Sequence, residues 1–96
     1  MSALGALHMA RIRMAGCCVG NRGFGGCSGP MEIHHVAQGS GARSDFATAC
    51  LCQNHHRGGV GLHGMGTKAF CRLYRPFGDS EFGLLAWVNE DLARGA

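Results

Sequence analysis

The sequence predicts a small α+β domain in which metal ions or disulfides reinforce a modest hydrophobic core. The chain has 96 residues, which fits one domain, and its 17 glycines indicate many loops and tight turns. A core of this size rarely holds a fold alone. Six Cys and six His, clustered along the chain, supply the side chains for such reinforcement.

Two short runs predict a β-hairpin at the centre of the chain. Residues 31–36 alternate so that Ile33 and His35 share one face of a strand and His34 lies on the other. Residues 46–51 read as its partner strand. Around this hairpin we expect, in order, a flexible leader over 1–8 (with Met9 as an alternative start), a short helix or strand over 9–15, a glycine-rich loop over 16–30, a loop over 38–45, a short helix over 53–57, a loop over 60–66, a helix over 67–75 capped by Thr67, and a helix over 80–94 capped by Ser80.

The charges are unevenly distributed. Eight of the nine Lys and Arg residues lie in 1–75, together with all the Cys and His, whereas four of the six acidic residues lie in 76–96. The net charge of +3 suits an anionic partner. The N-terminus lacks a secretory pattern, and the longest apolar run, Leu84–Val88, is too short to span a membrane. We therefore expect a cytoplasmic protein without a membrane partner, whose Cys and His bind metal.

The histidines occur as two adjacent pairs, His34-His35 and His55-His56, followed by His63. Adjacent residues of a strand send their rings to opposite faces, so one ring can bind a metal while the other acts as a general base. Imidazole titrates near neutrality without tuning. A divalent cation held by imidazoles neutralises the charge that develops on a phosphate, so the pattern favours phosphodiester hydrolysis.

The cysteines indicate a second metal site. Cys52 and His55 have the two-residue gap of a zinc half-site. Cys17 and Cys27 can complete a tetrahedral set from the glycine-rich loop, with Cys18 as the alternative to Cys17. Such a site contributes folding free energy directly. Cys50, Cys71 and His8 are expected to pack without a metal role.

Three runs, taken in order, carry a resemblance to a known family. They are Glu32-Ile33-His34-His35, Leu51-Cys52-Gln53-Asn54-His55-His56-Arg57-Gly58-Gly59 and Leu62-His63-Gly64-Met65-Gly66-Thr67-Lys68-Ala69-Phe70. This order resembles the HNH, or ββα-metal, endonucleases, and is more closely similar to the phage recombination enhancement function (Ref) nucleases. The similarity covers roughly residues 9–75.

The resemblance implies a fold and a set of roles. The fold would be a ββα-metal domain with a structural zinc knuckle over 9–75, with a C-terminal helix over 76–96 packed on it. His35 would be the general base, and His34, His56 and His63 would hold the catalytic ion, with a phosphate contact as the alternative for His63. That ion would be Mg²⁺ or Mn²⁺, with Zn²⁺ as a third option. The implied structural zinc ligands are Cys17, Cys27, Cys52 and His55.

The chain departs from the family pattern at two places. The first half of the knuckle is usually Cys-x-x-Cys, but here Gly20 stands where the second Cys would follow Cys17, so Cys27 has to serve. The Asn that steadies the loop bearing the base would fall near Ala47 or Thr48, and neither replaces it well.

The predicted function is metal-dependent hydrolysis of DNA phosphodiesters. Basic residues expected to contact the DNA backbone are Arg43, Arg57, Lys68, Arg72 and Arg75. Such contacts give affinity without base reading, so little sequence preference and a strong salt dependence are expected. The resemblance also implies a recombinase filament as a partner. The main alternative is a non-catalytic zinc module that binds nucleic acid, and a third class is a disulfide-stapled secreted peptide.

Overall fold

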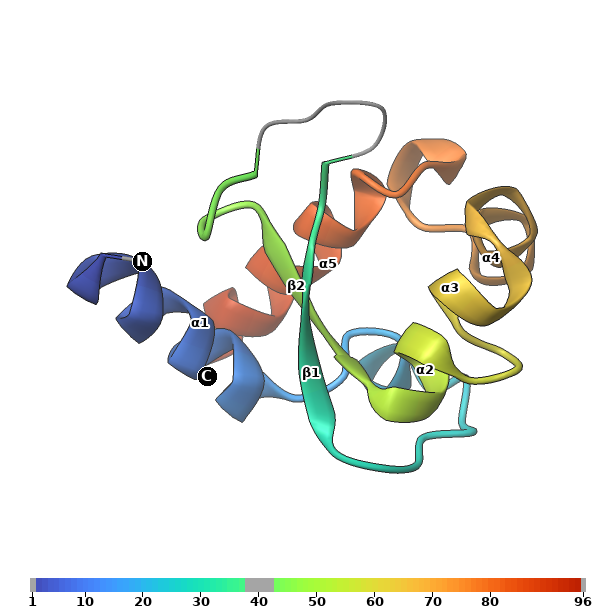
Figure 1. The fold of residues 1–96 in the computed structure, drawn as a ribbon, viewed down its shortest axis with the longest axis horizontal. Helices are drawn as coiled ribbons and strands as arrows, with labels where there is room; N and C mark the ends of the chain where they lie inside the picture. The colour runs from blue at the N-terminus through green and yellow to red at the C-terminus, as the bar shows by residue number, and fades with distance from the viewer. Residues whose placement is uncertain (1, 38–42, 96) are drawn as a thin grey trace.

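The computed structural model describes residues 2–37 and 43–95 and confirms the predicted α+β class. Its sheet has two antiparallel strands, β1 (Met31–His35) and β2 (Thr48–Cys52), with Met31 opposite Cys52 and His35 opposite Thr48. Every residue of β2 is buried, whereas β1 buries only His34 fully. β1 is therefore the strand nearer the protein surface, and β2 lies nearer the core (Figure 1).

Helices surround the hairpin. α1 (Ala3–Ala15) and α5 (Gly83–Ala93) contact β2 and each other. On the opposite side, α2 (Gln53–Arg57), α3 (Leu62–Met65) and α4 (Thr67–Tyr74) follow β2 along the chain (Figure 1). Two 3-10 turns, η1 (Gly20–Arg22) and η2 (Phe77–Asp79), precede β1 and α5. The largest fully buried side chains of the shared core are Ile12, Val19, Leu51, Leu62, Phe70 and Leu84.

Residues 3–8, expected as part of a flexible leader, form the first half of α1 instead. The Ser2 side chain caps this helix by accepting a hydrogen bond from the Gly5 N–H at 3.0 Å. Met9 and Ile12 are buried beneath it. A Cβ at Gly5 would lie 2.7 Å from Asp45 Oδ2, so glycine allows α1 to pack closely on the turn before β2. The helix packs against the rest of the protein as far as its first turn, where Gly5 meets Asp45. The apolar sequence of residues 3–8 does not reveal this packing.

Three helix starts differ from the sequence expectation. His63 lies in α3 and not in a loop. Thr67 is the first residue of α4, whose N-cap is Gly66. Ser80 does not cap α5 directly: its Oγ accepts the N–H of Phe82 at 3.2 Å, and the helix begins at Gly83. The loop expected over 38–45 falls partly outside the described residues.

A buried ion pair joins the C-terminal helix to the loop that precedes β1. Arg22 Nη1 lies 2.8 Å from Asp91 Oδ1, and both side chains are largely buried. Asn21 donates to the second oxygen of Asp91 at 3.0 Å, while Arg22 Nη2 donates to the Trp87 carbonyl at 2.7 Å. The packing of residues 76–96 on the rest of the chain thus has a specific electrostatic component.

Among the residues described, no helix combines the length and apolar character that a membrane crossing requires.

Candidate metal centres

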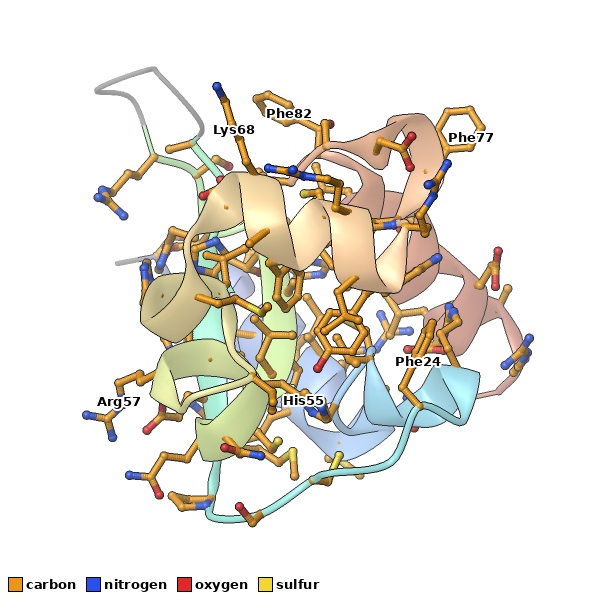
Figure 2. The ribbon with its side chains drawn as sticks, turned by 90° about the vertical axis from the view of Figure 1, so that its right-hand side faces the viewer. Phe24, His55, Arg57, Lys68, Phe77 and Phe82 are labelled. Carbon is orange, nitrogen blue, oxygen red and sulfur yellow. The ribbon has the colours of Figure 1, made fainter. Side chains whose placement is uncertain are left out.

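Cys17, Cys27, Cys52 and His55 converge on one point, with all four ligand atoms within 4.8 Å of one another. Cys52 ends β2 and is the N-cap of α2, so His55 follows it by one helical turn. Figure 2 shows His55 pointing into the protein and Arg57 pointing outward from the same short helix. Cys17 arrives from the segment after α1, and Cys27 from the loop that leads to β1.

The spacing within this Cys3His group fits a tetrahedral zinc ion. The His55 Nδ1 atom lies 3.5 Å from Cys17 Sγ, 3.6 Å from Cys27 Sγ and 3.2 Å from Cys52 Sγ. Zn–S bonds of about 2.3 Å and Zn–N bonds of about 2.0–2.1 Å at tetrahedral angles place sulfur and nitrogen about 3.6 Å apart. Three soft sulfur donors and one imidazole are also the ligands that zinc prefers. The group could therefore hold a structural metal such as zinc.

Gly20 explains how Cys27 enters this group. A Cβ at position 20 would lie only 2.5 Å from Cys27 Sγ and 4.0 Å from Cys17 Sγ. The Cys27 sulfur thus occupies the space into which a side chain at position 20 would project. The absent second Cys of the Cys-x-x-Cys pattern is replaced in space by a sulfur from seven residues further along the chain.

The other cysteines behave as expected. Cys18 is buried but outside the Cys3His group, and its N–H donates to the Cys50 carbonyl at 3.0 Å. Cys50 and Cys71 are buried in the hydrophobic core. Burial raises the pKa of Cys50 to about 12, so its thiol stays neutral. All six thiols are free, so the arrangement gives no support to a disulfide-stapled fold.

His34, His56 and His63 form a second group, again with ligand atoms within 4.8 Å of one another. They come from β1, α2 and α3, and their ring centroids are 5.3, 5.3 and 4.9 Å apart. His34 is buried, His56 is partly buried and His63 is exposed. The group is therefore closed on the protein side and open at His63, as a metal site that admits a substrate needs to be.

Two carboxylates contact histidines of this group and orient their rings. His56 Nδ1 lies 2.8 Å from Glu32 Oε1, and His34 Nε2 contacts the Glu81 carboxylate. A carboxylate that accepts from one ring nitrogen fixes the orientation of the ring and leaves the other nitrogen for a metal. Hydrogen bonds from Arg57 and His56 lower the pKa of Glu32, which keeps it ionised. Burial lowers the pKa of His34, against its hydrogen bond with Glu81, which favours the neutral, metal-binding form.

His35 does not join this group. As its strand position predicts, it shares a face with Ile33, and both line a hollow under α1 together with Met9 and Asp45. Its Nε2 lies 3.0 Å from Asp45 Oδ1. Asp45 is itself held by its turn, where its carbonyl accepts from Thr48 Oγ1 at 2.9 Å. This carboxylate orients the ring of His35.

The basic residues predicted to contact DNA are spread over the surface. Arg57 is committed to Glu32, with Nη2 2.6 Å from Oε2, and Arg75 pairs with Asp79 at 3.3 Å. Arg43, Lys68 and Arg72 are exposed. His8 lies outside both metal groups, with its ring 5.1 Å from that of Phe46.

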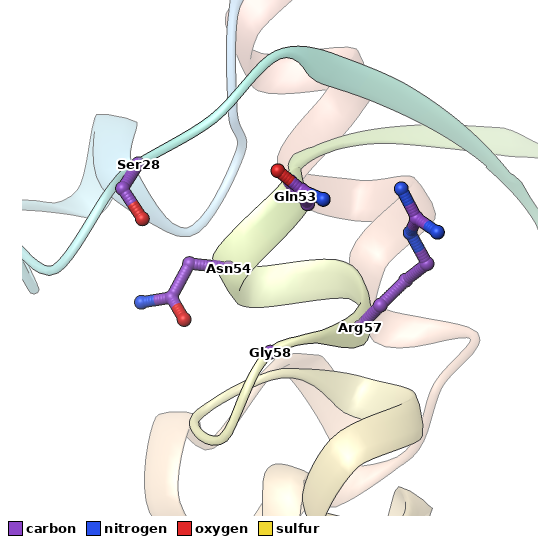
Figure 3. Close-up of a pocket in the computed structure, with 5 residues that line it drawn as sticks. All are labelled: Ser28, Gln53, Asn54, Arg57 and Gly58. Atoms are coloured by element: carbon purple, nitrogen blue, oxygen red, sulfur yellow. The ribbon is translucent and has the colours of Figure 1, made fainter.

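A polar pocket of about 340 Å³ adjoins the Cys3His group (Figure 3). Gln53, Asn54, Arg57 and Gly58 of α2 and its end form one wall, and Ser28 faces them from the loop before β1. Asn54 Nδ2 donates to the Gly26 carbonyl at 2.6 Å, so this amide serves to hold the loop that carries Cys27.

Sequence reasoning missed the supporting carboxylates. Glu32 and Glu81 lie far from each other in sequence, and only the fold brings each to a histidine. The position of Glu32 two residues before His34 was a usable signal, because both then share one face of the strand. Asp45 and Glu81 gave no such signal.

The fold and these two groups define a small α+β protein with a two-stranded sheet and a Cys3His group able to hold a structural metal. In comparisons with protein-family models, curated proteins and solved structures, no match to the chain was found.

Proposed function

We propose that the protein is an HNH-type, metal-dependent DNA endonuclease. The observation that carries this proposal is the convergence of His34, His56 and His63 on one point, closed behind by carboxylates and open at His63. Three imidazoles with free positions beside them are suited to hold a divalent ion in contact with a phosphate. When bound, an ion such as Mg²⁺ or Mn²⁺, or alternatively Zn²⁺, neutralises the phosphate and stabilises the leaving oxygen.

In this proposal His35 is the general base. Its ring lies across β1 from that of its neighbour His34, and within the described ranges β1 pairs only with β2. Adjacent residues of a strand send their side chains to opposite faces, so the proposal places the phosphodiester at the free edge of β1, where the two faces meet. Asp45 holds the His35 ring through its Nε2 atom. The other ring nitrogen of His35, Nδ1, takes the proton of the attacking water.

The Cys3His group helps to position the three-His group, because one residue of each is adjacent in α2. His55, a ligand of the structural zinc, directly precedes His56, a ligand of the catalytic ion, in a helix of five residues. So short a helix has little stability of its own. A zinc ion that fixes the start of α2 therefore fixes the position of His56.

DNA is the proposed partner, bound through its phosphates by exposed Arg and Lys side chains. Arg43, Lys68 and Arg72 are the most available of these. A recombinase filament that selects the cleavage site, and a cytoplasmic location, belong to the same proposal through the family resemblance.

The proposal is tested by nicking of supercoiled plasmid DNA with added Mg²⁺ or Mn²⁺. His56→Ala and His35→Ala should each abolish nicking while the structural zinc stays bound. His8→Ala is the matched control, because His8 lies outside both metal groups. Unchanged nicking in His35→Ala would remove the general base from the scheme, and unchanged nicking in His56→Ala would remove the metal.

A second candidate function is a zinc-stabilised module that binds nucleic acid without cutting it. It is favoured by one observation, which is that His35 lies on the opposite face of β1 from the three-His group. Wild-type protein that binds DNA but does not nick it under any divalent metal would establish this alternative.

A further inference from the structure

An exposed aromatic corner lies at the start of the C-terminal helix. Phe77 is 78% exposed and Phe82 is 50% exposed, although both are large apolar side chains in a chain with few aromatics. In Figure 2 both rings project away from the body of the protein, at the same end of the molecule as Lys68. Two exposed aromatic rings at the same end of the molecule offer apolar surface to a ligand.

The corner is rigid. A Cβ at Gly83 would overlap the backbone of Phe77, so the chain around Phe82 is packed directly against the turn that carries Phe77. Pro76 is fully buried, and the turn is closed by a hydrogen bond from the Asp79 N–H to the Pro76 carbonyl at 2.7 Å. The backbone positions that carry the two rings are therefore closely packed before a ligand binds, which limits the conformational freedom of the backbone that binding would cost.

Cations accompany the two rings. Lys68, Arg72 and Arg75 are spaced by four and three residues, so they share the exposed face that runs along α4 toward Phe77. Arg75 is paired with Asp79, whereas Lys68 and Arg72 make no ion pair with any other residue in the described ranges. The charge that would complement this stripe is negative.

The corner also adjoins the three-His group. Phe82 directly follows Glu81, whose carboxylate contacts His34. Lys68 lies at the start of α4, five residues after His63. A ligand that covers the corner and the stripe therefore extends toward the proposed catalytic metal.

We propose that Phe77 and Phe82 form a stacking platform for the bases of an unpaired nucleic-acid strand, whose phosphates lie along Lys68 and Arg72. Aromatic faces combined with cations bind single strands without base reading, since every base offers a face for stacking. In a duplex those faces are covered by neighbouring base pairs. The inference rests on the proposed function for its ligand, DNA, and adds that the strand beside the cut is unpaired.

The test is binding, which does not require cleavage. Fluorescence anisotropy of a labelled single strand of about 20 nucleotides, and of the same strand in a duplex, is measured with zinc-loaded protein without added Mg²⁺ or Mn²⁺. Phe77→Ala and Phe82→Ala should each weaken single-strand binding about tenfold and change duplex binding less than about twofold. Phe77→Leu should behave like Phe77→Ala, because it keeps the apolar bulk but not the aromatic face. Lys68→Ala should weaken binding to both DNA forms. For the single strand, the slope of log K against log salt concentration should become less steep by about 0.7.

Several results would overturn the inference. They are an equal loss for single and double strands, no loss at all, or full binding by Phe77→Leu. Self-association that disappears in Phe77→Ala, with DNA binding unchanged, would assign the corner to a second copy of the chain. Failure of the proposed nuclease function is distinguishable, because it would appear as absent nicking with the Phe-dependent single-strand binding intact.

Discussion

Gly20→Ala tests whether Cys27 is the fourth zinc ligand. The added Cβ would lie 2.5 Å from Cys27 Sγ, about 1 Å inside a normal van der Waals separation of about 3.5 Å. The Cys27 sulfur would have to move by about 1 Å, whereas zinc–ligand distances tolerate only about 0.2 Å. If one of four ligands is lost from a site worth about 10–16 kcal/mol, the cost is about 3 kcal/mol, so zinc affinity should fall on the order of 100-fold.

The assay is competition between the protein and a zinc chelator, together with the visible absorption of the cobalt-substituted site. Gly59→Ala is the matched control, since a Cβ there would meet no heavy atom of the described residues within 4 Å. The double variant Gly20→Cys/Cys27→Ser should recover most of the zinc affinity that Cys27→Ser alone loses. Wild-type affinity in Gly20→Ala, or no recovery in the double variant, would refute the assignment of Cys27.

Three further outcomes follow from the side-chain contacts. Glu32→Gln removes the charge behind His56 and should lower Mn²⁺ affinity or nicking about 10- to 100-fold, with zinc content unchanged; unaltered Mn²⁺ titrations would contradict this role. Asp45→Ala should reduce the nicking rate about 10- to 100-fold at constant KM, and an unchanged nicking rate would contradict the role of Asp45 in orienting His35. Arg22→Ala leaves the buried carboxylate of Asp91 in α5 without its ion-pair partner. It should lower the free energy of unfolding, measured by urea denaturation of zinc-loaded protein, by about 3–5 kcal/mol. A loss below about 1 kcal/mol would be incompatible with this pairing.

The sequence predicted the hairpin and the Cys52–His55 half-site because those features depend on local spacing, whereas the grouping of His34, His56 and His63 was expected from the family resemblance. Alternation over residues 31–36 placed His34 and His35 on opposite faces, and the structure confirms this placement. The gap between Cys52 and His55 matches one turn of α2. The grouping of Cys17 and Cys27 with them was predicted from ligand chemistry and is confirmed by the spacing of the four atoms.

The parts that sequence could not predict depend on contacts between distant segments. The first half of α1 has no amphipathic pattern, and the contact of Gly5 with Asp45 that accompanies it joins segments forty residues apart. Glu81 reaches His34 only because the turn that precedes α5 lies near β1. The sequence predicted that Cys27 serves in place of a second Cys at position 20, but it could not predict that the Cys27 sulfur occupies the space into which a side chain at position 20 would project.

Metal stoichiometry tests the central claim, that this chain holds a structural and a catalytic metal, most directly. Native mass spectrometry of protein titrated with Zn²⁺ should show two bound ions in the wild type and one in His56→Ala. Cys52→Ser should lose the structural ion first. Two ions in the wild type, with selective loss in the two variants, are the result we predict. A single ion would leave only the zinc-stabilised module, and no bound ion would contradict both proposed functions.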